Sequence, residues 1–215
     1  MLELYISTVI TFFVLIDPLG IAPIYGVMMD GASKAYKRRV VLKACLTGTI
    51  ILLMFAFLGN QLLKSLGIGM MAFKTAGGVL LFMIALEMVF ERRTERREKR
   101  SEDFAHDHDD KIKDEDIEDP SIFPLGIPFI AGPGAIASII LLMAQNSGNY
   151  EMQGIIIGAL MTALVLTMII LLAAGKIIDL LGQTIATAIT RILGVLLAAM
   201  ATQYIFDGIK GAFLG

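Results

Sequence analysis

The chain has 215 residues, of which 56% are hydrophobic, and its mean hydropathy is +0.76. Ordinary soluble domains have about 45–50% apolar residues, so this composition excludes an ordinary soluble domain and favours a membrane protein. The net charge of −2 indicates no partner, because 21 of the 38 charged residues lie between Glu91 and Asp119. No basic surface with interleaved aromatic residues suggests nucleic acid binding. The single cysteine, Cys45, excludes an internal disulfide.

Outside the charged stretch, the sequence contains six apolar runs that are long enough to cross a bilayer, which takes about 20 residues. In chain order, these runs are Leu4–Met29, Val40–Leu63, Ile68–Phe90, Ile122–Met143, Met152–Ala174 and Ile185–Phe206. Glu3 stands where a signal peptide would have a basic residue, so the first run is interpreted as a retained span. The sequence therefore predicts an all-α polytopic membrane protein with six transmembrane helices.

Proline and glycine interrupt the first and fourth runs, although both residues are unfavourable inside a helix. The interruptions are Asp17-Pro-Leu-Gly-Ile-Ala-Pro23 and Ala131-Gly-Pro-Gly-Ala135. An unmade backbone hydrogen bond is costly in hydrocarbon, so a broken helix persists only where protein or a hydrated cavity covers the break. We therefore interpret the two breaks as parts of a binding site.

The two halves of the sequence match each other at nearly one offset. A shift of 115 places Pro18 on Pro133, and a shift of 116 places Gly78-Val-Leu-Leu on Gly194-Val-Leu-Leu. This pattern predicts a first three-span repeat at 1–90, a charged linker at 91–121 and a second repeat at 122–215. Because each repeat has three spans, the second must run through the membrane inverted, a plan typical of secondary transporters.

Basic residues are distributed unequally between the two ends of the predicted spans. One side holds Lys34, Lys37, Arg38, Arg39, the arginine-rich start of the linker and Lys176, and the other holds Lys64 and Lys210. The positive-inside rule then predicts an inner (plasma) membrane protein with both termini extracytoplasmic and the linker 91–121 cytoplasmic. Within the linker, His106–Asp110 is interpreted as a solvated acidic tract and not as a metal site.

Asp17 is the sharpest candidate for a functional side chain. A carboxylate inside a span is costly unless it is paired or hydrated, which makes it a functional hypothesis. It could also serve only as the N-cap of the half-helix that follows, with Pro18 at the first helical position. Both interpretations are compatible with the sequence.

Each second half-helix should present free backbone N–H groups that suit a carboxylate, while the carbonyls of the first half-helix suit an ammonium group. Two facing breaks could thus hold a zwitterion. The predicted substrate-binding residues are Asp17, Pro18, Gly20, Ile21, Ala22, Pro23, Gly132, Pro133, Gly134, Ala135 and Ser138.

Lys74 and Arg191 join Asp17 as candidates for gating or coupling. Each basic residue lies near the start of its span, so it could extend to the membrane surface or form a salt bridge with Asp17 or another carboxylate. Glu87 and Asp207 are predicted to be interfacial. The sequence contains no set of nucleophile, base and orienting residue, no metal-ligand cluster and no cofactor motif. We therefore expect no enzymatic activity, no metal and no cofactor.

The motifs at Asp17–Pro23, at Pro128–Ile136 and at Thr190-Arg-Ile-Leu-Gly194 resemble the MarC family. This family is also described as the SnatA or NAAT group of small neutral amino acid transporters, within the LysE superfamily. The resemblance implies an inner-membrane transporter of inverted repeats that binds glycine- or alanine-sized substrates at the broken first and fourth spans. Two residues depart from the pattern: Asp17 stands where many relatives have asparagine, and Lys74 where arginine is common.

Together, these patterns predict a secondary transporter for small neutral amino acids, with the bilayer and the substrate as its partners. It would work by alternating access around two facing helix breaks, with a proton or sodium ion as the candidate coupling ion. The alternatives are an uncoupled channel or exporter of small solutes, and a membrane enzyme or lipid-handling protein. An adaptor whose linker docks a cytoplasmic partner is a further alternative. The sequence does not indicate an oligomeric state.

Overall fold

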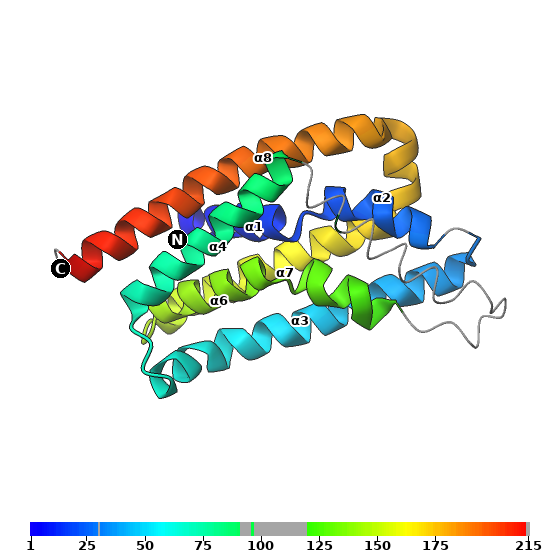
Figure 1. Ribbon diagram of the computed structural model, residues 1–215. Coiled ribbons are helices and arrows are strands. Elements are labelled where there is room, and N and C mark those ends of the chain that lie inside the picture. Colours follow the sequence, from blue (N-terminus) through cyan, green and yellow to red (C-terminus); the bar gives the residue numbers. More distant parts are fainter. Residues whose placement is uncertain (30, 91–95, 97–119, 214–215) are drawn as a thin grey trace.

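The computed structural model describes residues 1–29, 31–90, 96 and 120–213, and the predicted linker lies almost entirely outside this part of the chain. The regular elements of the described residues are all helices, as Figure 1 shows. They are α1 (Leu2–Ile16), α2 (Pro18–Met28), α3 (Lys34–Ser65), α4 (Met70–Val89), η1 (Ser121–Ile130), α6 (Pro133–Gln145), α7 (Tyr150–Leu172) and α8 (Ala174–Phe213).

The predicted spans are confirmed by the lengths and composition of these helices. Five candidate spans lie at Leu2–Met28, which contains α1 and α2, and at Lys34–Ser65, Met70–Val89, Tyr150–Leu172 and Thr184–Phe213. The sixth consists of η1 and α6, which meet at an angle of 55°. The predicted class, an all-α polytopic membrane protein, is therefore confirmed, and the fourth span is bent at its break.

The two long helices extend beyond their apolar runs. α3 begins at Lys34, six residues before the predicted Val40, because the Ser33 hydroxyl accepts a hydrogen bond from the N–H of Tyr36 and so caps the helix. α8 starts with a short segment that ends at Gly182, whose φ of 71° is unfavourable for residues with a side chain. The long part of α8 then runs from this turn to the end near the C-terminus (Figure 1).

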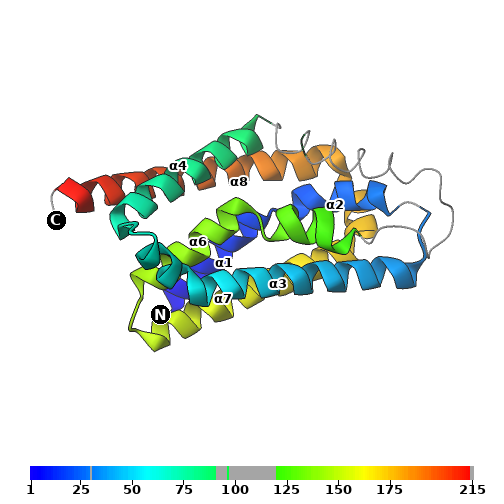
Figure 2. The same ribbon diagram turned by 60° about the horizontal axis from the view of Figure 1, so that its bottom comes forward.

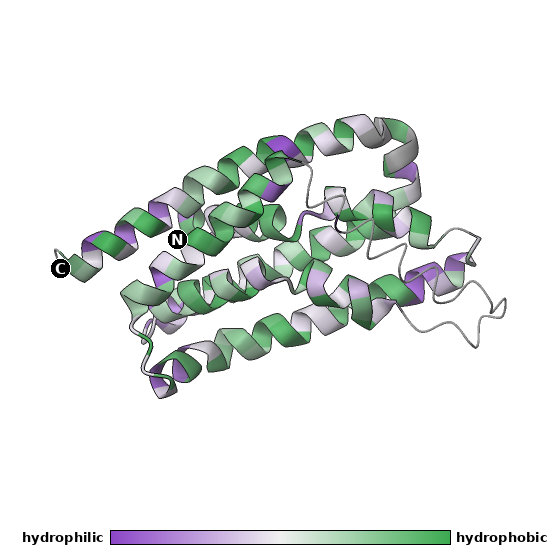
Figure 3. Cartoon of the chain, viewed as in Figure 1, coloured by the Kyte–Doolittle hydropathy of each residue, from purple (hydrophilic) through white to green (hydrophobic). Residues whose placement is uncertain are grey.

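The outer surface of the bundle is apolar, as a lipid environment requires. Exposed large hydrophobic side chains occur along the membrane-spanning helices, for example at Leu46, Ile50, Phe57, Met83, Val165 and Val195. Figure 3 shows hydrophilic residues at the two ends of α3, near the C-terminal end of α8 and at one place midway along α8, with mainly apolar residues elsewhere on these helices. The bilayer would cover this continuous apolar surface, which a soluble monomer does not expose.

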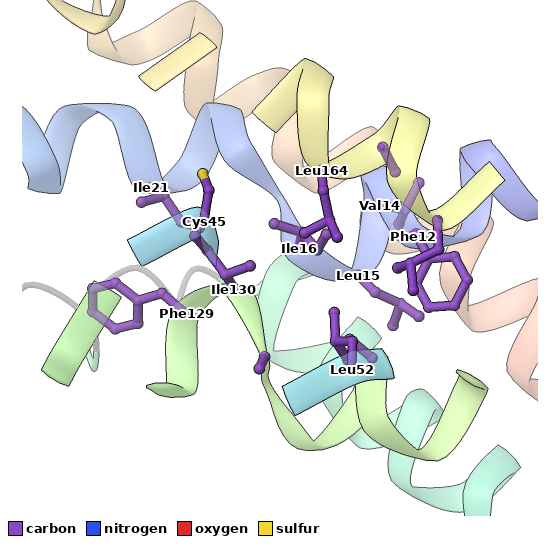
Figure 4. Close-up of a cluster of buried hydrophobic side chains, with 14 of the residues drawn as sticks. Phe12, Val14, Leu15, Ile16, Ile21, Cys45, Leu52, Phe129, Ile130 and Leu164 are labelled. Atoms are coloured by element: carbon purple, nitrogen blue, oxygen red, sulfur yellow. The ribbon is translucent and has the colours of Figure 1, made fainter. Parts of the chain in front are cut away.

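The buried core surrounds the two helix breaks. Ile16 at the end of α1 and Ile130 at the end of η1 are both fully buried, and they belong to one cluster with Leu164 of α7. Figure 4 shows these side chains gathered between α1, α3, η1 and α7. Protein therefore covers both interruptions of the backbone, as the prediction for a broken helix in a membrane requires.

α4 packs along α8 (Figure 2), and two glycines allow the close approach. A Cβ added at Gly78 would lie 2.9 Å from the carbonyl oxygen of Ala201, and one at Gly194 would lie 3.1 Å from that of Ala85. The offset of 116 that relates the two glycines also relates Ala85 to Ala201. The contact is thus reciprocal, and in this register Thr190 corresponds to Lys74.

Candidate functional site: a cavity at the second helix break

The second break is more irregular than the sequence analysis predicted. Within η1, Phe123 and Ile127 have extended backbone angles, and each precedes a proline in a cis peptide bond. Proline lacks the N–H that would continue a regular helix, so Pro124 and Pro128 keep this segment from forming one. The irregularity therefore begins about ten residues before the predicted interruption at Gly132.

The regular helix resumes where it was predicted to resume. Gly132 is the N-cap of α6 and Pro133 is its first residue, where proline is favoured because its missing N–H has no intrahelical partner there. Gly132 must be glycine, since an added Cβ would lie 2.8 Å from the backbone oxygen of Pro128. The N-cap residue, Gly132, has no side chain with which to cap α6. The first N–H groups of α6 therefore lack a partner from the capping residue.

A cavity of about 260 Å³ lies at this end of α6. Four predicted binding residues line it: Gly132, Pro133, Gly134 and Ala135. Its other lining residues come from α1, α4, η1 and the linker, and they are Leu15, Ile84, Glu87, Pro128, Phe129 and Arg96. The break thus opens on a small pocket between these elements.

Two charged residues at the cavity were not predicted to belong to it. Arg96 donates a hydrogen bond to Glu87, and the two also form an ion pair. The Glu87 side chain is 24% exposed and the Arg96 side chain is 68% exposed, so the arginine is the more accessible partner. Glu87 was predicted to be interfacial because it lies near the end of its span. Its place at the cavity was not predicted, because helix packing decides which side of α4 faces the break.

The first break is built differently, because it is capped by its own residue. Asp17 has left-handed backbone angles (φ 55°, ψ 61°) and is 1% exposed. One of its carboxylate oxygens accepts hydrogen bonds from the N–H of Gly20 at 3.2 Å and from the hydroxyl of Thr190 at 3.0 Å. The prediction that Asp17 caps the following half-helix is confirmed, and so is the position of Pro18 as its first residue.

The remaining residues predicted at the first break lie in the core around this cap. Pro18, Gly20, Ile21 and Ala22 are buried, Pro23 is half-buried, and none of them lines the cavity at the second break. Leu15 is the cavity residue that α1 supplies. In this structure, the cavity is therefore formed by the second break and by α4, with the end of α1 as a wall.

Lys74 pairs with a carboxylate other than Asp17. Its ammonium group lies 3.0 Å from Asp207 Oδ2 and 5.9 Å from the centre of the Tyr204 ring. The side-chain amide of Gln203 donates to the other oxygen of Asp207 at 2.7 Å. This cluster joins the start of α4 to the last part of α8, far along α4 from Glu87.

The other two candidates do not line the cavity. Arg191 is exposed and follows Thr190 on α8. Ser138 is 1% exposed, and its hydroxyl has no hydrogen-bond partner among the residues that the structure describes. It lies one turn beyond Gly134 on α6, on the side of that helix that packs against α1 and α4.

Comparison with known proteins identifies the family. The model of the MarC family integral membrane proteins matches residues 2–213. The chain belongs to this family. The resemblance expected from the sequence motifs is therefore confirmed.

Several MarC family relatives match over nearly their whole length. A UPF0056 membrane protein of Methanocaldococcus jannaschii is 34% identical over 99% of this chain and 89% of its own. One from Pyrococcus horikoshii is 34% identical over 94% of this chain and 92% of its own. One from Buchnera aphidicola is 31% identical, covering 97% of both chains. No solved structure gives a significant match.

Within this MarC family protein, the cavity combines two kinds of polar group in an apolar wall. The start of α6 presents N–H groups at the positive end of the helix dipole, which favours a negatively charged group. Glu87 supplies a carboxylate, which favours a positively charged one. Leu15, Ile84 and Phe129 supply the apolar wall. Such a site can bind a small solute that carries both charges.

Proposed function

We propose that this protein is a secondary transporter that moves small neutral amino acids of the glycine and alanine class across the inner (plasma) membrane by alternating access. The observation that carries the proposal is the uncapped start of α6, which opens on a cavity of about 260 Å³ inside a membrane-spanning bundle. Sites for drug-sized ligands measure about 300–1,000 Å³, so this cavity suits a smaller solute.

A comparison of the two breaks supports a carboxylate as the ligand at the second. The offset of 115 that places Pro18 on Pro133 also places Asp17 on Gly132. At the first break, the Asp17 carboxylate accepts a hydrogen bond from the third residue of the half-helix, Gly20. At the second break the corresponding residue has no side chain. A substrate carboxylate would accept hydrogen bonds from the first N–H groups of α6, as the Asp17 carboxylate does from the N–H of Gly20 at the first break.

The arrangement of the helices supports an inverted repeat, which alternating access requires in transporters of this plan. The reciprocal contacts of Gly78 and Gly194 are those expected when α4 and α8 are related by a two-fold axis. The two chain ends lie at one end of the bundle, and the basic start of α3 lies at the other (Figures 1 and 3). The positive-inside rule then favours extracytoplasmic termini.

Uptake into proteoliposomes tests the proposal. Labelled glycine and alanine are offered to the wild-type protein, with and without an imposed proton or sodium gradient. We expect saturable uptake that one of the two gradients drives. Flux that does not saturate and that neither gradient drives would favour an uncoupled channel instead.

The location of the site is tested with two glycine variants. A Cβ at Gly134 would lie 2.8 Å from Ile84 Cδ1 and 3.2 Å from Leu15 Cδ2, two side chains that line the cavity, whereas one at Gly154 of α7 meets nothing within 4 Å. We expect Gly134→Ala to lower the uptake of alanine by about tenfold or more and Gly154→Ala to leave it unchanged. Wild-type uptake by Gly134→Ala would contradict a site at the second break.

A further inference from the structure

We propose that Glu87 binds the ammonium group of the substrate and that Arg96 takes the place of this ammonium group when the cavity is empty. The inference rests on the proposed function and names the side chain that would recognise the ammonium group of the amino acid. In this arrangement, the Glu87 side chain binds the ammonium group of the substrate, and the backbone N–H groups at the start of α6 bind its carboxylate.

The position of Glu87 relative to the break supports this role. Ile84 contacts the break directly, since its Cδ1 atom lies 2.8 Å from a Cβ built on Gly134. Glu87 follows three residues later, on the same side of α4 and roughly 5 Å further along its axis. Glu87 and Gly134 both line the cavity. The carboxylate and the start of α6 therefore border the same small cavity.

The electrostatics of the cavity explain why Glu87 needs a cation. Its side chain is 24% exposed and lies beside the apolar side chains of Leu15, Ile84 and Phe129. A carboxylate in such surroundings is costly unless a cation compensates for its lost hydration. Arg96 provides that cation in the present structure.

Arg96 is suited to being replaced because most of its own side chain is in contact with solvent. Its exposed fraction is 68%, so the guanidinium keeps most of its hydration whether or not it is paired with Glu87. Exposed ion pairs contribute little to stability, and they exchange readily for other partners. A substrate ammonium that enters the cavity would therefore compete with Arg96 for the same carboxylate.

The two residues should consequently affect transport in opposite directions. Alanine and propionate share a carboxylate and a similar size, but propionate lacks the ammonium group. We expect the wild type to take up labelled alanine, with unlabelled alanine as a strong competitor and propionate as a weak one. Glu87→Gln should raise the KM for alanine by about tenfold or more and should reduce the preference for alanine over propionate. Arg96→Gln should lower the KM for alanine, because it removes the competing cation.

Two further variants separate this role from a structural one. Glu87→Asp keeps the charge and should retain the preference for alanine, with a higher KM. Glu151→Gln neutralises an exposed carboxylate in the first turn of α7 and should change neither quantity. Each variant is first checked for a wild-type elution profile in detergent. If Glu87→Gln fails this check, the KM of Arg96→Gln and the preference of Glu87→Asp decide the question.

The outcomes distinguish this inference from the proposed function. Absence of saturable alanine uptake by the wild type overturns both. Wild-type uptake combined with an unchanged preference in Glu87→Gln overturns the assignment of Glu87 alone. An unchanged or higher KM in Arg96→Gln overturns the exchange of Arg96 for the substrate.

Discussion

At the scale of single residues, Asp17 and Gly132 occupy corresponding positions and have opposite properties. Asp17 supplies a carboxylate that accepts hydrogen bonds from the N–H of Gly20 and the hydroxyl of Thr190. Gly132 supplies no side chain, and α6 begins beside a cavity. Asp17 therefore supplies a carboxylate to the half-helix that follows it, while Gly132 supplies none to α6.

The cap at Asp17 makes a prediction about stability. Asparagine keeps an oxygen that can accept hydrogen bonds from the N–H of Gly20 and the hydroxyl of Thr190, and it tolerates left-handed backbone angles. Alanine loses the cap and is strained at a φ of 55°. We expect Asp17→Ala to lower the free energy of unfolding by about 1–3 kcal/mol and Asp17→Asn to lower it by much less. Thermal unfolding of the purified protein in detergent measures the difference, with Asn149→Ala, an exposed cap of α7, as the control.

Asp17→Asn also tests whether Asp17 carries a proton that is coupled to transport. Because both recorded donors can bind an amide oxygen as well as a carboxylate, we expect Asp17→Asn to transport alanine with an unchanged dependence on an imposed pH gradient. The measurement is proteoliposome uptake with and without the gradient. Loss of the pH dependence with retained uptake would assign the coupled proton to Asp17, the alternative role that the sequence left open.

At the scale of helices, the contact between α4 and α8 depends on glycine at two reciprocal positions. The carbonyl oxygen of Ala201 lies 2.9 Å from the position that a Cβ on Gly78 would take. The carbonyl oxygen of Ala85 lies 3.1 Å from the corresponding position on Gly194. Backbone atoms cannot move aside as the end of a flexible side chain can. The distance between these two helices is therefore set by the absence of a Cβ on each.

This contact is tested with two adjacent glycines. Alanine is the better helix former by about 1 kcal/mol, so Gly→Ala stabilises a helix wherever space allows. An added Cβ at Gly77 meets nothing within 4 Å, whereas one at Gly78 would lie 2.9 Å from two backbone atoms of α8. We expect Gly78→Ala to be destabilised by about 1–3 kcal/mol and Gly77→Ala to be neutral or stabilised. Equal unfolding temperatures for the two variants would contradict the described packing.

The helices also show what can be predicted from local sequence. Pro18 and Pro133 were predicted to begin their half-helices because proline is favoured at the first helical position, and both do so. The irregular course of η1 was not predicted, although Pro124 and Pro128 were the signal for it. The glycines around Pro133 fall in the middle of the apolar run, so the irregularity was predicted there, whereas it already begins at Phe123.

At the scale of the whole molecule, hydrophobicity alone was sufficient to predict the six spans and the helical class. Contacts between distant residues could not be predicted in the same way. Three features depend on how α4 and α8 pack. They are the ion pair of Lys74 with Asp207, the hydrogen bond between Asp17 and Thr190, and the position of Glu87 at the cavity. Apolar periodicity carries little information about that packing in a membrane, because lipid-facing and buried sides are both hydrophobic.

The orientation of the molecule is open to direct test. Cys45 is buried, and Cys45→Ser provides a background without cysteine. In this background, Ser147→Cys lies between α6 and α7, and Lys176→Cys lies at the start of α8; both positions are exposed. We expect a membrane-impermeant maleimide to label Ser147→Cys in intact cells and Lys176→Cys only after permeabilisation. The reverse pattern would place the termini in the cytoplasm.

The cap that Asp17 forms also fixes a stoichiometry. A protein with two equivalent breaks could hold two carboxylates, one at each half-helix, but here the first position is already filled by a covalently attached one. On the proposed function, only one molecule of amino acid can therefore bind per chain, and each transport cycle carries a single substrate. Equilibrium dialysis of labelled alanine against the purified protein should give a stoichiometry of about one, and a second equivalent would mean that Asp17 can leave its cap.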